Sequence, residues 1–194
     1  MCKTVFNMLH AILSSFALVA VSEMGDKTQL LAFSLAARYK KPWPIMGGIF
    51  VATLLNHALA STVGQWVSFQ ISPKTLAISL GAIFIMFAIW TLKPDTFEEG
   101  KKEDRFGPFL TTAVLFFLAE MGDKTQLATI ALGARYQSAV AVTFGTTLGM
   151  LVTDGLAVFL GEKFSDRVQM KWIRISAALL FFAFGTASLV AAFF

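Results

Sequence analysis

The stretch EMGDKTQ at residues 23–29 decides the fold, because the same seven residues return at positions 120–126. In a chain this short, chance gives such a repeat odds on the order of one in a hundred thousand, so an internal duplication is the first explanation to consider. The alignment runs without a gap from Glu23 to Tyr39 and from Glu120 to Tyr136, with 12 of 17 positions identical. The chain is therefore predicted to contain two copies of one ancestral unit.

The composition indicates an all-α integral membrane protein. Hydrophobic residues make up 56% of the chain and charged residues only 14%, with 20 phenylalanines and a mean hydropathy of +0.69, which is outside the usage of soluble domains. Apolar stretches of about 20 residues can cross a bilayer as helices. Six transmembrane helices are predicted, at residues 12–37, 44–67, 75–92, 109–134, 138–160 and 172–194.

The net charge of +4 does not indicate nucleic-acid binding, because the basic residues are spread along short loops beside the membrane ends. The lipid bilayer is the expected partner. One cysteine, Cys2, excludes an internal disulfide and a thiolate metal cluster. The first twenty residues resemble a secretory signal, but the apolar pattern continues through the motif, so this segment is predicted to be retained.

The domain plan follows from the number of spans in each copy. Repeat one is predicted at residues 1–92 and repeat two at 108–194, separated by a polar linker at 93–107. Three spans are an odd number, so the second copy should enter the membrane upside down relative to the first. This gives two inverted three-helix repeats, the plan of many secondary transporters, whose substrate site lies near the midplane where the halves meet.

Loop charge predicts the orientation. Two of the 16 lysines and arginines lie in the motifs, three (Lys3, Lys74 and Arg135) lie on the N-terminal side of the spans, and the remaining eleven lie on the other side. Positively charged loops stay in the cytoplasm. Both termini are therefore expected outside the cytoplasm, and three loops inside it, at residues 38–43, 93–107 and 161–171.

Each copy of the motif places ionisable side chains in the middle of an apolar span, where charge is costly and indicates a site. In a continuous helix, Glu at position i, Asp at i+3 and Lys at i+4 share one face. The glycine between Met and Asp weakens the helix and allows a local break that would free backbone carbonyls. Structural ion pairs within each motif are the alternative, but four carboxylates against two ammonium groups leave two negative charges unbalanced.

The candidate metal ligands are the acidic residues and the neutral oxygens one turn on: Glu23, Asp26, Thr28, Gln29, Glu120, Asp123, Thr125 and Gln126. Lys27 and Lys124 would balance charge. In the second span of each copy, Asn56 and His57 correspond to Thr153 and Asp154, which are candidates for a proton relay or for contacts behind the ligands. For His57, an internally hydrogen-bonded histidine is the alternative to ligation. No catalytic residue and no cofactor is predicted.

The donor set fits a hard divalent cation. Carboxylate, hydroxyl and amide oxygens suit Mg²⁺, Ca²⁺ and Mn²⁺, and the lack of cysteine in the spans argues against Zn²⁺ or Cu⁺. The thioethers of Met24 and Met121 would favour Mn²⁺ if they ligate, although methionine at helical spacing is more often packing. The residues alone leave open which of the three ions is carried.

The motif Glu-x-Gly-Asp-Lys-Thr, present in the first and fourth spans of a six-span chain, resembles the cation transporter family of the Golgi and chloroplast manganese and calcium transporters and of the bacterial manganese exporters of the MneA type. This resemblance covers essentially the whole chain. It implies export of Mn²⁺, or Ca²⁺, in exchange for protons. It also implies a site formed by residues 23 and 26–28 with residues 120 and 123–125. The short N-terminus lacks the extension of organellar members, which favours a bacterial inner membrane.

Other functions remain open at this stage. The carboxylates could bind the ammonium groups of a basic amino acid or another small cation, although two lysines within the site disfavour this. Two aspartates on facing helices could form an intramembrane aspartyl protease, but neighbouring lysines would keep them ionised. A channel or uniporter would carry the ion without proton exchange. The oligomeric state and the role of the 93–107 loop are not predicted.

Overall fold

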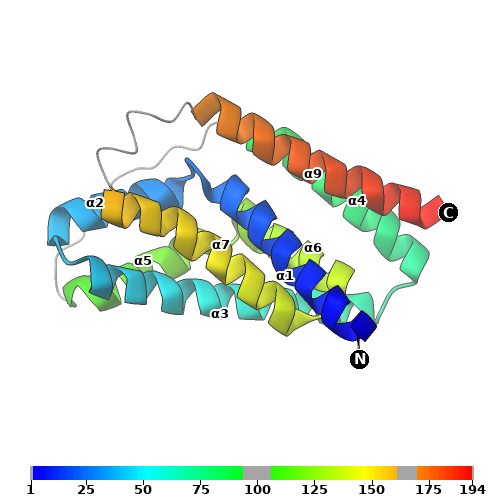
Figure 1. Cartoon of the computed structure of the whole chain (residues 1–194), viewed down its shortest axis with the longest axis horizontal. Helices are drawn as coiled ribbons and strands as arrows, with labels where there is room; N and C mark the ends of the chain where they lie inside the picture. Colours follow the sequence, from blue (N-terminus) through cyan, green and yellow to red (C-terminus); the bar gives the residue numbers. More distant parts are fainter. Residues whose placement is uncertain (1, 94–105, 161–169, 194) are drawn as a thin grey trace.

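The computed structural model describes residues 2–93, 106–160 and 170–193, and all regular structure in these ranges is helical (Figure 1). The helices are α1 (Cys2–Glu23), α2 (Lys27–Tyr39), α3 (Pro42–Ser68), α4 (Pro73–Thr91), α5 (Gly107–Glu120), α6 (Lys124–Tyr136), α7 (Ala139–Leu160) and α9 (Met170–Phe193). Most of the predicted linker at 93–107 and of the loop at 161–171 lies outside the described residues.

Five helices are long and apolar enough to cross a membrane, and α5 is a shorter apolar helix. The outer surface agrees with this, because large apolar side chains such as Trp43, Leu59 and Val140 are exposed around the bundle. An apolar surface this extensive would not be stable in water. The prediction of an all-α, multi-pass membrane fold is confirmed at this level.

Continuous helices at 12–37 and 109–134 were a wrong prediction. In both places the structure has two helices, α1 with α2 and α5 with α6, and the break falls inside the motif. Gly25 has φ +80° and Gly122 has φ +76°, a left-handed conformation that ends a helix and that glycine adopts at little cost. The local break that the glycine was expected to allow is therefore present.

Helix contacts recur between the two halves at an offset of 97 residues. A Cβ on Gly48 of α3 would lie 2.6 Å from the carbonyl oxygen of Phe109 in α5, and one on Gly145 of α7 would lie 2.4 Å from that of Ile12 in α1. Positions 48 and 145 correspond, as do 12 and 109. Helix α1 thus packs on α7 as α5 packs on α3, and glycine permits both close approaches.

Helices α4 and α9 form a pair of their own (Figure 1). Ring centroids lie 5.7 Å apart both between Phe84 and Phe184 and between Phe87 and Phe181. The two contacts are equivalent, because the offset of 97 residues relates position 84 to 181 and position 87 to 184. This pair packs on α1 and α6. Both chain termini lie at one end of the bundle, whereas the link between α2 and α3 lies at the other (Figure 1).

Candidate metal site

The two helix breaks have the same local structure. Helix α1 ends at Glu23, and Asp26 is the N-cap of α2, with its N–H bonded to the Glu23 carbonyl at 3.0 Å. In the second copy α5 ends at Glu120, and the Asp123 N–H bonds to the Glu120 carbonyl at 3.2 Å. The glutamate therefore closes one helix and the aspartate opens the next, so the two do not share one helical face as predicted.

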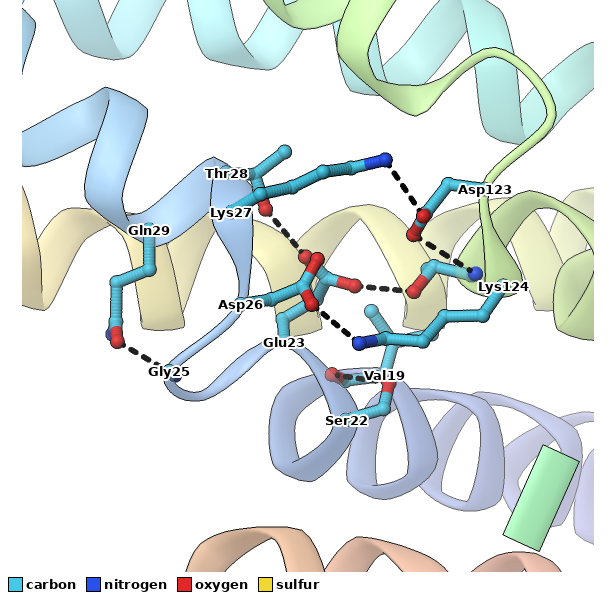
Figure 2. A network of polar contacts seen from close by, with 11 residues as sticks. Val19, Ser22, Glu23, Gly25, Asp26, Lys27, Thr28, Gln29, Asp123 and Lys124 are labelled. Atoms are coloured by element: carbon cyan, nitrogen blue, oxygen red, sulfur yellow. Dashed lines mark hydrogen bonds and ion pairs between the residues drawn. The ribbon is translucent and has the colours of Figure 1, made fainter. Parts of the chain in front are cut away.

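A glutamine side chain supports each break. The Oε1 atom of Gln29 accepts the N–H of Gly25 at 2.8 Å (Figure 2), and Gln126 accepts the N–H of Gly122 at the same distance. The Nε2 atom of Gln29 donates to the carbonyl oxygen of Thr153 at 3.0 Å. The oxygen and the nitrogen of the Gln29 side-chain amide therefore both hold the backbone in place.

The second helices α3 and α7 meet the breaks through equivalent positions. The Nε2 atom of Gln126 donates to the Oδ1 atom of Asn56 at 3.4 Å, and Asn56 itself donates to the carbonyl oxygen of Phe117 at 3.1 Å. Asn56 and Thr153 correspond in the two halves, and each contacts the glutamine of the other half. Asn56 and Thr153 therefore hold the glutamine side chains that support the two helix breaks.

The lysines form ion pairs across the two copies rather than within them (Figure 2). The Nζ atom of Lys27 lies 2.7 Å from the Oδ1 atom of Asp123, and Lys124 donates to Asp26. Consecutive residues at the start of a helix point about 100° apart, so Asp26 and Lys27 are directed to different partners. The alternative of ion pairs within each motif is thus replaced by pairs between the two motifs.

The two glutamates differ in their partners. Glu23 is fully buried and accepts the hydroxyl of Thr28 at 2.7 Å on one oxygen and the hydroxyl of Thr125 on the other. Glu120 is also buried, at 1% exposure, but neither of its oxygens has a hydrogen-bond partner among the described residues. A buried carboxylate without a partner is unfavourable, so Glu120 has an unsatisfied capacity to bind a cation or a proton.

The carboxylates converge at one place. Glu23, Glu120 and Asp123 each offer an oxygen within 4.8 Å of the others, and all three residues are buried. Oxygens at this spacing can all reach one divalent cation, since protein oxygens bind Mg²⁺ or Ca²⁺ at about 2.0–2.6 Å. Among the described residues, this is the one group of acidic, histidine or cysteine side chains with metal-binding geometry.

Asp154 and His57 occupy equivalent positions in α7 and α3, and both are fully buried. Neither oxygen of Asp154 has a hydrogen-bond partner in the described part of the chain. The Nδ1 atom of His57 lies 3.5 Å from the Thr147 hydroxyl. His57 is not part of the carboxylate cluster, and its Nε2 atom has no hydrogen-bond partner among the described residues.

Side chains of the third helices also reach the site, which the sequence did not indicate. A pocket of about 10 Å³, with room for about one water molecule, is lined by Val21, Ser22, Met24, Gly25, Asp26, Thr91, Lys124, Arg174 and Ala177. Thr91 lies in α4 and Arg174 lies in α9. No sequence signal could have found Thr91, because single threonines are common in membrane helices. Met24 lines this pocket, whereas Met121 is 56% exposed.

Comparison with known proteins gives consistent matches over both halves. Residues 11–99 and 108–194 match the family described as divalent cation/proton antiporter GDT1. A protein of Vibrio cholerae named "Putative manganese exporter" is 42% identical, covering 94% of this chain and 92% of its own length. A GDT1-like protein of Synechocystis is 30% identical, covering 93% and 97%, and GDT1-like protein 3 of Arabidopsis thaliana is 29% identical, covering 94% and 71%. No solved structure matches the chain.

Proposed function

Because this chain belongs to the GDT1 family of divalent cation/proton antiporters, we propose that it exports Mn²⁺ from the cytoplasm in exchange for protons, with Ca²⁺ as the alternative ion. The chain is a transporter and not an enzyme, which excludes the alternative of an aspartyl protease. The observation that carries the proposal is the buried cluster of Glu23, Glu120 and Asp123. The choice of Mn²⁺ is supported by the name of the Vibrio cholerae relative.

We assign the substrate ion to the three clustered carboxylates. The hydroxyls of Thr28 and Thr125 adjoin Glu23 and are further ligand candidates, as is the Asp26 carboxylate. Gln29 and Gln126 remain predicted ligands, but each Oε1 accepts a backbone N–H, which supports a positioning role for both. Lys27 would compete with the ion for Asp123, since its ammonium lies 2.7 Å from that carboxylate.

Charge balance supports proton exchange. The two lysines pair with the two aspartates, which leaves the two glutamates as net negative charge in a low-dielectric interior. One divalent cation or about two protons would neutralise them, and a bare charge there is costly. A carrier that moves only in its neutralised states would exchange one metal ion for about two protons. Asp154, if ionised, would raise that number to about three.

We further propose two inverted three-helix repeats in a bacterial inner membrane, with both termini outside the cytoplasm. The reciprocal contacts at an offset of 97 residues and the position of both termini at one end of the bundle support this arrangement (Figure 1). Single cysteines at Lys41 and Lys74, on a Cys2→Ser background, test the orientation, because both positions are exposed. An impermeant thiol reagent should label only Lys74→Cys in intact cells, and the reverse pattern would invert the topology.

Proteoliposomes that contain a pH-sensitive dye test the transport function. An imposed pH gradient should drive Mn²⁺ movement, and Mn²⁺ movement should change internal pH, with Ca²⁺, Mg²⁺ and lysine compared as substrates. The Glu120→Gln variant should show neither effect, whereas Glu99→Gln in the linker is the matched control and should behave like wild type. Metal movement without proton movement would indicate a channel or uniporter, and transport of lysine in place of metal would indicate an amino-acid exporter.

A further inference from the structure

The α4–α9 pair covers only one half of each broken span. It packs on α1 and α6. Both of these helices lie between the motifs and the end of the bundle that holds the two chain termini (Figure 1). This end is called the terminal end below. Helices α2 and α5, which run to the opposite end, pack instead on α7 and α3. The helix pair therefore breaks the symmetry of two halves whose other contacts are reciprocal.

At the terminal end, Arg135 joins α6 to α9. Its Nη1 atom donates to the hydroxyl of Ser188 at 2.5 Å, and its guanidinium lies 5.8 Å from the centroid of the Phe184 ring. Ser188 is fully buried. Helix α6 also packs closely on α3 at this end, since a Cβ on Gly133 would lie 2.4 Å from the carbonyl oxygen of Ser61. The terminal end is therefore closed by packing as well as by the Arg135 contacts.

At the opposite end, the equivalent residues are present but apart. Positions 97 residues earlier hold Arg38, Phe87 and Thr91, so the arginine, the aromatic ring and the hydroxyl all recur. Yet Thr91, at 3% exposure, has no hydrogen-bond partner for its hydroxyl and lines the pocket beside Asp26. Arg38 is exposed and its guanidinium lies 5.6 Å from the Tyr39 ring centroid.

We propose that Arg135–Ser188 and Arg38–Thr91 are two alternating latches, of which the first is closed in this structure and the second is open. In the other state the α4–α9 pair rocks onto α2 and α5, Arg38 bonds Thr91, and Arg135 releases Ser188. Such an exchange of roles between inverted repeats gives alternating access to a central site. The inference rests on the proposed function and orientation, which make this structure the cytoplasm-facing state and the Thr91 pocket its cytoplasmic side.

Two cysteine reporters at equivalent positions test the latches in the full-length chain, again with Cys2→Ser. Ala177→Cys lies in the pocket, and Leu80→Cys is its counterpart near the terminal end; both native side chains are buried. Because both positions are buried in this structure, each cysteine can react only when its end of the bundle opens. With intact latches, an impermeant maleimide should label Ala177→Cys in inside-out vesicles faster than it labels Leu80→Cys in right-side-out vesicles.

Arg135→Ala should slow labelling of Ala177→Cys and speed labelling of Leu80→Cys, with a change of about tenfold in their ratio, as expected for loss of a charge-assisted hydrogen bond. Arg38→Ala should shift the ratio in the opposite direction. If Arg135→Ala fails to fold, Ser188→Ala removes the same bond with a smaller change and should act in the same direction.

The matched control is Thr186→Ala, which removes the hydroxyl of a half-buried residue of α9; among the described residues this hydroxyl bonds carbonyls of its own helix, at 3.0 Å. If Arg135→Ala and Ser188→Ala change the ratio of the two labelling rates no more than Thr186→Ala does, the latch proposal is wrong. Labelling needs no metal, so its outcome is separate from that of the transport assay. If the labelling ratio shifts but the protein transports no metal, the latch proposal stands and the proposed function is wrong. If the protein transports metal but the ratio does not shift, the proposed function stands and the latch proposal is wrong.

Discussion

The two copies of the motif share all seven residues, but their carboxylates have different surroundings. Glu23 accepts two threonine hydroxyls, whereas Glu120 accepts no hydrogen bond from any described residue. In the Lys124–Asp26 pair the side chains are 4% and 0% exposed, compared with 26% and 8% in the Lys27–Asp123 pair. Identical sequence therefore gives two non-equivalent halves of one site, because the helices around each half differ.

This difference suggests a division of labour. A carboxylate that already has two donors is held in place as a preformed ligand. A buried carboxylate without donors is stable only when a cation or proton arrives, so it senses whether the site is occupied. We infer that Glu23 provides the fixed half of the site and Glu120 the half that responds to the substrate.

The largest expected effect is loss of transport when a carboxylate becomes an amide. Glu120→Gln, Asp123→Asn and Asp26→Asn should each reduce Mn²⁺ transport by at least about 100-fold while the protein still folds, because each removes a charge on which the site depends. Transport by the purified variants and manganese tolerance of a sensitive host both measure this. Substantial tolerance conferred by Asp123→Asn would show that its carboxylate is structural.

The next effect concerns the crossed ion pairs. Lys124→Ala leaves Asp26 without its lysine in the interior and should lower the free energy of unfolding by about 3–5 kcal/mol. Lys27→Ala should cost less than Lys124→Ala, because the Lys27 side chain is 26% exposed and that of Lys124 is 4% exposed. Unfolding in mild detergent measures both, and adding Asp26→Ala should recover part of the loss in Lys124→Ala. If Asp123→Ala recovers it instead, the pairing has been assigned to the wrong partners.

The two glutamates should respond to amide substitution with opposite changes in stability. Glu23→Gln weakens the hydrogen bonds from Thr28 and Thr125 and should lower the unfolding free energy by about 1–3 kcal/mol. Glu120→Gln removes an uncompensated charge and should raise the melting temperature, measured in chelator to exclude bound metal. Equal shifts for the two variants would mean that the glutamates are equivalent in the resting protein.

The smallest effect is that of the glycine that breaks the second span. A Cβ on Gly122 would meet no atom within 4 Å, so Gly122→Ala tests only the cost of its φ of +76°, about 1–2 kcal/mol. Gly155→Ala is the control, because its Cβ would make an ordinary contact, 3.4 Å from Met46, and the residue lies within α7. A thermal shift no larger for Gly122→Ala than for Gly155→Ala would show that the break is not set by the backbone of Gly122.

Much of this molecule could be predicted from its sequence. The duplicated motif and the apolar composition gave the all-helical membrane fold, and the intramembrane Glu23, Glu120 and Asp123 were predicted ligands before any geometry was known. The helix break was harder, because EMGDKTQ fits a helical face as well as a turn. The left-handed φ of Gly25 and the hydrogen bond that its N–H donates to the Gln29 side chain decide between the two, and both depend on the folded chain.

The partners of the lysines and the role of the third helices were beyond the sequence for a different reason. A lysine next to an aspartate is compatible with a local pair, and only the meeting of the start of α2 with the start of α6 directs Lys27 to Asp123 instead. Thr91 carries no signal of its own. Its proposed role follows from its equivalence to Ser188. That equivalence is informative only once the structure shows that α4 packs on α9 and that this pair covers α1 and α6.

The crossed ion pairs have a consequence for how such a chain could have arisen. A half-length protein with one motif would have a lysine and an aspartate side by side that cannot satisfy each other. Two identical halves running in opposite directions would satisfy both at once, since the lysine of each reaches the aspartate of the other. With the inverted repeats proposed above, the motif is self-complementary, because each copy supplies the lysine that pairs with the other copy's aspartate. Gene fusion would then have preserved a dimer that already worked, and left each half free to specialise.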